Sequence, residues 1–98
     1  MPMQPVHPGE VIAEDILKEL GLTNRQLAEI LHVPTRRVSD IVRGQRPITA
    51  DFALRLAQWL GSPPHFWLDL QKRYDLETAI LAAGDEIQRT VRPIQSAA

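Results

Sequence analysis

Apolar residues recur every three or four positions along most of the chain, and this spacing predicts a series of short amphipathic helices. We expect them over residues 8–20, 23–32, 35–43 and 49–60, with a fifth helix beginning after Pro63 and Pro64. The positions expected to face the core are Ile12, Ile16, Leu17, Leu20, Leu27, Ala28, Ile30, Leu31, Val38, Ile41, Val42, Ala53, Leu56, Ala57, Leu60, Phe66, Trp67, Leu70 and Tyr74. Such a pattern is typical of a small all-α domain.

Residues that satisfy free backbone groups mark the expected helix ends. Thr23 is followed three residues later by Gln26, which is a capping box, and Thr49 is a favoured N-cap for the fourth helix. Pro34 disfavours helical geometry in the residue before it, so the second helix should stop near His32.

The pattern weakens after Tyr74. Residues 76–83 could form another short helix that Gly84 would break, and residues 88–94 fit either an edge strand or an extended tail. We therefore expect five helices in a domain over residues 1–81, followed by a short C-terminal extension over residues 82–98 that is helical, extended or disordered.

Composition excludes several classes of protein. The chain of 98 residues has room for one domain and contains no cysteine, so disulfide frameworks and thiolate zinc sites are excluded. The histidines His7, His32 and His65 are scattered, so we expect no metal and no cofactor. Glu14 and Asp15 are neighbours that face different directions on a helix, and we expect no enzyme activity. With no apolar run of about 18 residues and no secretory signal, a cytoplasmic protein is expected.

Charge is unevenly distributed, although the formal net charge is only −1. Residues 1–22 hold one basic and four acidic side chains, whereas residues 23–48 hold five basic and two acidic ones. All five of those basic residues are arginines, whose planar fork suits phosphate oxygens and guanine edges. The middle of the chain is therefore the candidate surface for an anionic partner.

Two short helices joined by a tight turn, with basic residues facing outward on the second, describe a helix-turn-helix. In this motif the start of the second helix reaches base edges in the major groove, while the helix before it crosses the phosphate backbone. The residues predicted to contact DNA are Thr23, Asn24, Arg25, Gln26, Thr35, Arg36, Arg37, Ser39, Asp40, Arg43 and Arg46. The alternative is a merely solvated basic face, but the helix spacing, the caps and the local charge together favour DNA binding.

The stretch from Leu22 to Gly44 resembles the helix-turn-helix of phage-repressor-like (XRE-type) regulators. Narrower markers are His7-Pro8-Gly9-Glu10, Arg46-Pro47-Ile48-Thr49, and Phe66-Trp67-Leu68-Asp69-Leu70-Gln71 followed by Tyr74-Asp75-Leu76. In this order, over roughly residues 6–80, they resemble the HigA-type antitoxins, also called VapI-type plasmid-maintenance proteins. The resemblance implies a five-helix, repressor-like fold.

It further implies a homodimeric antitoxin that inhibits a HigB-type mRNA endonuclease and represses its own operon through operator DNA. The alternative is a free-standing XRE-type transcriptional regulator without a toxin partner, and a third possibility is a neutraliser with a vestigial helix-turn-helix. Pro34 stands where relatives commonly have a Ser or Thr cap, and Asp40 where many carry a polar or basic base-reading residue. These departures leave the operator sequence open, but not the mode of binding.

Two further surfaces are predicted. An RNA-cutting toxin needs a basic surface for phosphates, so the acidic first helix is the candidate toxin contact. Its residues are Glu10, Glu14, Asp15 and Glu19. A single recognition helix buries little surface, which favours a dimer. The predicted dimer contacts are Phe66, Trp67, Leu70, Tyr74, Leu76 and Ile80. The aromatic cluster of Trp59, Phe66 and Trp67 either fills the core or is partly exposed for self-association.

Overall fold

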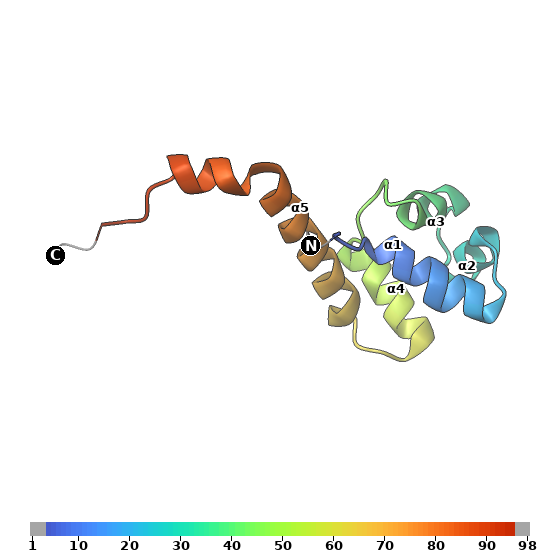
Figure 1. Cartoon of the computed structure of the whole chain (residues 1–98). Coiled ribbons are helices and arrows are strands. Elements are labelled where there is room, and N and C mark those ends of the chain that lie inside the picture. The colour runs from blue at the N-terminus through green and yellow to red at the C-terminus, as the bar shows by residue number, and fades with distance from the viewer. Residues whose placement is uncertain (1–3, 96–98) are drawn as a thin grey trace.

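The computed structural model describes residues 4–95 as a bundle of short helices from which one long helix projects (Figure 1). The elements are α1 (Pro8–Val11), the π-helical η1 (Ile12–Lys18) that continues it, α2 (Asn24–Leu31), α3 (Thr35–Val42), α4 (Ala50–Leu60) and α5 (His65–Thr90). Because α1 and η1 form one continuous helix, these are five helices, and residues 4–95 contain no strand. The predicted all-α, five-helix class is confirmed. None of these helices is long and apolar enough to cross a membrane.

The helix ends follow the caps that the sequence predicts. The Thr23 side chain accepts a hydrogen bond from the Gln26 N–H (3.1 Å), and the Gln26 side chain accepts one from the Thr23 N–H (2.9 Å). Thr49 caps α4 in the same way, with its hydroxyl 3.2 Å from the Phe52 nitrogen. At the end of α2, His32 adopts a left-handed conformation with φ of 57°, which turns the chain toward Pro34 and α3. Local chemistry therefore sets the short α2–turn–α3 unit.

Most of the predicted core positions are buried. The exceptions are Phe66, which is 50% exposed in the first turn of α5, and Leu20, Ile30 and Leu60, with exposed fractions of 56%, 38% and 38%. Leu20, Ile30 and Leu60 each lie within two residues of the C-terminal end of a helix, where the chain turns away and neighbouring helices give less cover. Phe52 and Ile48, which helical periodicity did not assign to the core, are 0% and 3% exposed. Their burial comes from the packing of the α3–α4 connection and the first turn of α4, which only the assembled bundle defines.

The C-terminal part of the chain differs from the prediction. Gly84 does not break the helix, because α5 continues to Thr90 and one interior glycine costs a helix only about 1 kcal/mol relative to alanine. The predicted boundary at residue 81 therefore falls inside one helix. Residues 91–95 form no regular element, and residues 96–98 lie outside the described residues.

The second half of α5 leaves the bundle and bends away from it (Figure 1). The Cα radius of gyration is 17.1 Å, compared with about 13 Å for a compact domain of this length. The projecting segment therefore has little of this chain to pack against.

Candidate nucleic-acid interface

The relative orientation of α2 and α3 is fixed by polar contacts as well as by the core. The Asn24 Nδ2 atom, in the first turn of α2, lies 3.3 Å from the Ser39 Oγ atom of α3. The Ser39 hydroxyl donates in turn to the Thr35 carbonyl oxygen, at 3.2 Å. Asn24 and Ser39, which were both predicted to contact DNA, are half-buried and join the two helices. Thr35 is exposed at the start of α3.

One carboxylate gathers three arginines on the outward side of α3. Asp40 lies 3.8 Å from Arg36, 3.0 Å from Arg43 and 3.5 Å from Arg46. The Asp40 side chain is only 14% exposed, whereas the three arginine side chains are 86%, 60% and 45% exposed. We call these four residues the Asp40 cluster. The arginines outnumber the carboxylate and cover it, so the cluster presents positive charge to the solvent.

The partners of Asp40 were only partly foreseen. Asp40 follows Arg36 by four residues and Arg37 by three, spacings at which either arginine can pair with it, and the structure pairs it with Arg36. Arg46 joins the cluster from the α3–α4 connection, a contact that helical spacing cannot predict.

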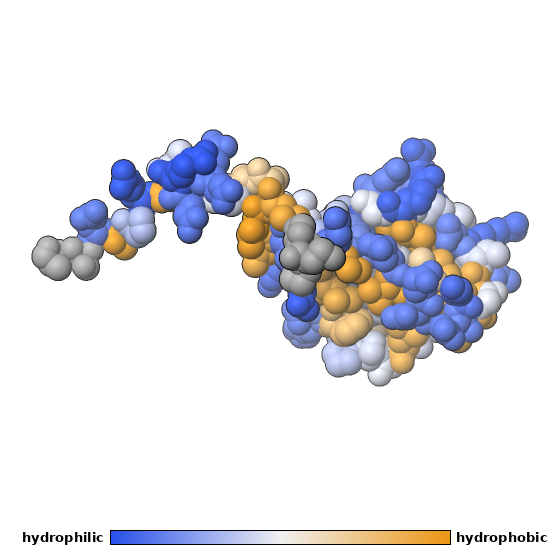
Figure 2. Space-filling view, viewed as in Figure 1, coloured by the Kyte–Doolittle hydropathy of each residue, from blue (hydrophilic) through white to orange (hydrophobic). Residues whose placement is uncertain are grey.

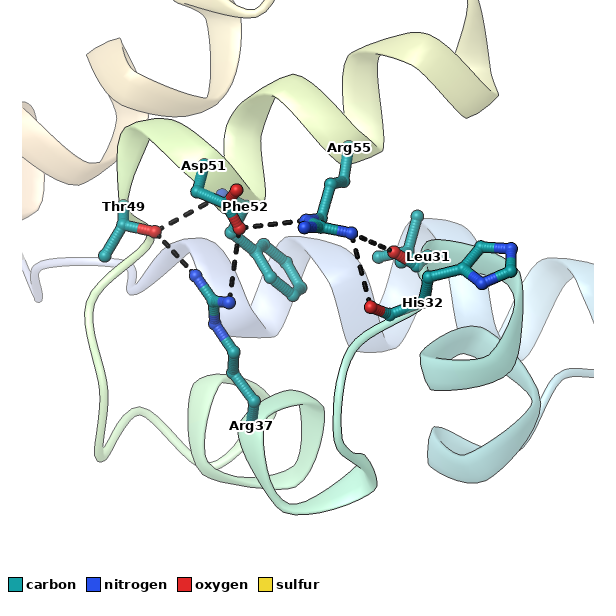
Figure 3. A network of polar contacts seen from close by, with 7 residues as sticks. All are labelled: Leu31, His32, Arg37, Thr49, Asp51, Phe52 and Arg55. Carbon is teal, nitrogen blue, oxygen red and sulfur yellow. Dashed lines mark hydrogen bonds and ion pairs between the residues drawn. The ribbon is translucent and has the colours of Figure 1, made fainter.

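Arg37 does not join the Asp40 cluster; its side chain points toward the start of α4 (Figure 3). Its Nη2 donates to the Thr49 hydroxyl at 2.9 Å, and its Nη1 lies 3.2 Å from the Asp51 carboxylate. The guanidinium also stands 5.7 Å from the centre of the Phe52 ring, and the side chain is 22% exposed. Arg37 was predicted to contact DNA. Because its guanidinium already binds Thr49 and Asp51, we assign it instead a structural role, which is to hold α3 to α4.

Arg55 completes this second network and was missed by the sequence analysis (Figure 3). Its Nη1 donates to the carbonyl oxygens of Leu31 and His32, at 2.9 and 3.2 Å, and so caps the C-terminal end of α2. Its Nε lies 2.9 Å from Asp51. The Arg55 hydrogen bond is the main reason that the pKa of Asp51 lies below its usual value. The four-residue spacing of Asp51 and Arg55 was a usable signal, but the carbonyls that Arg55 reaches are 23 and 24 residues away along the chain.

The remaining predicted DNA contacts lie at the start of α2. Thr23 and Gln26 are exposed and occupied with the capping box, and Arg25 is exposed beside Glu29 at 3.8 Å. Their side chains sit where the free N–H groups of a helix N-terminus could meet a phosphate. A role for them in DNA binding stays a prediction.

The predicted toxin and dimer surfaces are only partly assembled as expected. Glu14, Asp15 and Glu19 are exposed on η1 or just after it, whereas the Glu10 side chain accepts from the His7 N–H at 3.3 Å and completes the cap of α1. Among the predicted dimer contacts, Trp67 is 3% exposed and belongs to the core.

The other predicted dimer contacts divide along α5. Leu70 packs against the core and Tyr74 is half-buried, so both mainly join α5 to the bundle. Phe66, Leu76 and Ile80 are 50%, 61% and 57% exposed. These three therefore retain surface for a second chain.

Comparison with known proteins yields relatives that share this architecture. The helix-turn-helix family matches residues 14–67. Virulence-associated protein I of Dichelobacter nodosus is 48% identical over 77 residues, which cover 79% of this chain and 71% of that protein. An addiction module antidote protein of a HigA family from Coxiella burnetii matches with a TM-score of 0.89 and 46% identity, over 94% of this chain and 100% of that one. Pseudomonas aeruginosa antitoxin HigA, solved with the higBA promoter, matches with a TM-score of 0.90 and 39% identity, over 94% and 100%.

Proposed function

The chain belongs to the helix-turn-helix family and, within it, to the HigA family, as its motifs predicted, and on this premise we propose that it is an antitoxin that also represses its own operon. In this proposal the protein binds operator DNA through α3 and neutralises a HigB-type mRNA endonuclease through another surface. Both activities are binding functions. Binding to promoter DNA also fits a cytoplasmic protein.

The Asp40 cluster is the observation that carries the DNA-binding proposal. Arg36 stands at the start of α3, where a recognition helix reaches base edges, and its side chain is 86% exposed. Arg43 and Arg46 lie at and beyond the other end of α3, which suits contacts with the phosphate backbone. The shared carboxylate holds the three guanidinium groups in one region, so less side-chain freedom is lost when DNA binds.

The test is a titration of the full chain with a labelled fragment of its own promoter and with a scrambled fragment of equal length. We expect the promoter fragment to bind at least about 1,000-fold more tightly, the lower end of the usual range for specific DNA-binding proteins. Both affinities should fall as salt is raised, because arginine contacts release counterions. Equal affinity for the two fragments would leave no role in operator recognition.

For toxin neutralisation we propose the acidic side of the first helix as the docking surface. Glu14, Asp15 and Glu19 are exposed there, and the Asp40 cluster, which would repel a basic toxin, lies on α3 and the connection after it. The Coxiella and Pseudomonas relatives, an antidote protein and an antitoxin, support the neutralising function itself. Docking away from α3 would leave the arginines free for DNA.

Co-expression with the protein encoded directly upstream tests this. The wild-type chain should restore growth, and the double variant Glu14→Lys, Glu19→Lys should capture the toxin more slowly and with weaker salt dependence. A matched control, Asp69→Lys with Asp85→Lys, makes the same change in net charge on exposed positions of α5. Unchanged capture by the first double variant would move the interface elsewhere. If the protein encoded upstream does not arrest growth, the alternative of a regulator without a toxin partner is favoured.

We also propose that the projecting half of α5 joins two copies of the chain. Leu76, Ile80 and Ile87 are 61%, 57% and 51% exposed, and with Ala79 and Ala83 they follow the spacing of one apolar helix stripe. Figure 2 shows apolar side chains gathered along α5 where it leaves the bundle. Leu76 and Ile80 were already predicted as dimer contacts, but the sequence analysis did not foresee that one helix carries the stripe past Gly84 to Ile87.

Sedimentation of a matched pair of variants tests the dimer. Ile80→Glu should shift the protein to a monomer, because a charge would have to be desolvated in an apolar interface. Leu54→Glu places the same charge on α4, at a leucine that is 59% exposed, and should leave the dimer intact. A dimer that survives Ile80→Glu would assign the contact to another surface.

A further inference from the structure

Three motifs that lie far apart in the sequence meet in one buried junction at the base of α5. They are the segment that opens α1, the connection from α3 to α4, and the first three turns of α5. We call this the α1–α3–α5 junction, and define it by His7, Gly9, Ile48, Gln71 and Tyr74. It adjoins the Asp40 cluster, because Arg46, a member of that cluster, belongs to the same connection as Ile48.

His7 contacts all three parts of the junction. Its side chain is buried, and its Nδ1 accepts the Gly9 N–H at 2.9 Å, which caps α1. Its ring packs edge-on against Tyr74 of α5, with 4.8 Å between the ring centres. The ring also stands beside Gly44, in the connection from α3 to α4, where a Cβ atom on the glycine would lie 3.7 Å from the His7 Cγ. Burial keeps the pKa of His7 below its usual value despite the nearby Asp75 and Glu10 carboxylates, so the neutral ring that can accept the Gly9 N–H is favoured.

Gln71 ties α5 to the connection directly. Its side chain is 6% exposed, and its Oε1 accepts the Ile48 N–H at 2.8 Å. Its Nε2 donates to the Asp75 carboxylate at 2.9 Å, which fixes the orientation of the amide. Because Ile48 lies two residues after Arg46, this bond anchors the backbone that carries one arginine of the Asp40 cluster.

Gly9 brings α1 into direct contact with the end of α3. A Cβ atom on Gly9 would stand 1.9 Å from the Ile41 carbonyl oxygen, so only glycine allows the two backbones to approach this closely. The end of α3 is therefore held from one side by α1, while the connection that follows it is held by α5.

We propose that His7 and Gln71 are positioning residues for DNA binding, which lock the arginine-bearing end of α3 and its connection onto α5. This rests on the proposed function, in which α5 joins two copies and α3 reads DNA. If α5 sets the dimer axis, then the junction sets the distance and rotation between the two recognition helices. Half-sites about 34 Å apart are read only when that geometry is rigid.

The experiment uses promoter fragments in which one or two base pairs are added or removed between the half-sites. Wild-type protein should lose about tenfold or more in affinity at each altered spacing, because one base pair shifts a half-site in both distance and rotation. Gln71→Met removes both hydrogen bonds at similar volume. It should bind the native promoter about tenfold more weakly and lose less than about threefold on the altered spacings. Its affinity for scrambled DNA should stay unchanged.

Two further variants separate positioning from damage to the fold. The double variant Gln71→Glu, Asp75→Asn keeps an acceptor for the Ile48 N–H and lets residue 75 donate to residue 71, so it should recover most of the spacing preference. Gln58→Met makes the same change as Gln71→Met at an exposed position of α4 and should behave as wild type. Circular dichroism and sedimentation must show folded dimers at the assay temperature. A folded, dimeric Gln71→Met with wild-type spacing preference would overturn the proposal, as would a folded, dimeric Gln71→Glu, Asp75→Asn variant as tolerant of altered spacing as Gln71→Met. If wild type itself does not prefer its promoter, the proposed function fails instead.

Discussion

Two aspartates, Asp40 and Asp51, each pair with more than one arginine, but the two groups lie on different sides of the helix-turn-helix. Asp40 gathers Arg36, Arg43 and Arg46 on the outside of α3. Asp51 instead pairs with Arg37 and Arg55 on the side of the motif that faces α4. In the first group the arginines point their outer ends to the solvent, whereas in the second each guanidinium also donates to a protein group other than Asp51.

The difference shows that an arginine in a basic segment has no fixed role. Arg36 and Arg37 are adjacent in the sequence, yet their side chains are 86% and 22% exposed. Adjacent residues on a helix point in directions about 100° apart, so one faces the solvent and the other meets α4. We therefore expect changes in the first group to alter DNA recognition and changes in the second to alter stability.

The largest effect is expected for Arg36→Ala. Loss of a two-point contact with a base should reduce discrimination between promoter and scrambled DNA by about 1–3 kcal/mol. The free energy of unfolding should change by less than about 0.5 kcal/mol, because the side chain is exposed and its ion pair is long. Competition binding and thermal unfolding of the same sample measure both quantities. A stability loss larger than the binding loss would break the distinction between the two groups.

Arg37→Ala should show the opposite pattern. Removing the bond to Thr49 and the contact with the Phe52 ring should lower the free energy of unfolding by about 1–2 kcal/mol. The exposed pair with Asp51 is left out of this figure because solvent screens it. Denaturant titration measures the loss, and the promoter-to-scrambled affinity ratio, taken where the variant is folded, should match wild type. A reduced ratio would return Arg37 to the DNA surface.

Asp40→Ala tests whether the carboxylate organises the arginines or only opposes DNA. With Asp40 removed, Arg36 loses its partner one turn away, so the base preference at the contacted positions should change. Selection of preferred sequences from a randomised operator library reads this out, with wild type selected in parallel. Uniformly tighter binding to all sequences, with no changed preference, would indicate simple repulsion.

Arg43→Ala should weaken promoter and scrambled DNA alike. Arg43 lies at the C-terminal cap of α3, so its contact is expected to be with a phosphate. The slope of log affinity against log salt concentration should become shallower by about one. Titrations at several salt concentrations measure it, and Arg36→Ala is the comparison. A selective loss of promoter binding would make Arg43 a base-reading residue.

The smallest effect concerns acid stability and involves the Asp51 group alone. The Arg55 hydrogen bond lowers the pKa of Asp51, so the folded state favours the carboxylate more than the unfolded state does. This contribution is fully present above the unfolded pKa of about 3.9 and is lost as the pH falls through the lower folded value. Asp51→Asn should therefore lose less stability than wild type between pH 4 and pH 2. If the free energy of unfolding falls with pH in parallel for Asp51→Asn and wild type, this linkage is contradicted.

Much of the fold could be read from local patterns. The Thr23–Gln26 capping box and the Thr49 cap depend on residues three positions apart, and the structure confirms both. The error at Gly84 has a local cause as well, because a helix breaker was given more weight than the apolar stripe that continues through residues 76–87.

By itself, the sequence determined the helices, their caps and the basic character of the segment that contains α2 and α3, because each depends on neighbours within one or two helical turns. Only the tertiary structure decided which arginines are free for DNA. Arg37 is held by groups 12 and 14 residues ahead of it, and Arg55 by carbonyls 23 and 24 residues behind it. Helical periodicity gives the direction of a side chain from its own helix, but what stands in that direction is set by the packing of the other helices.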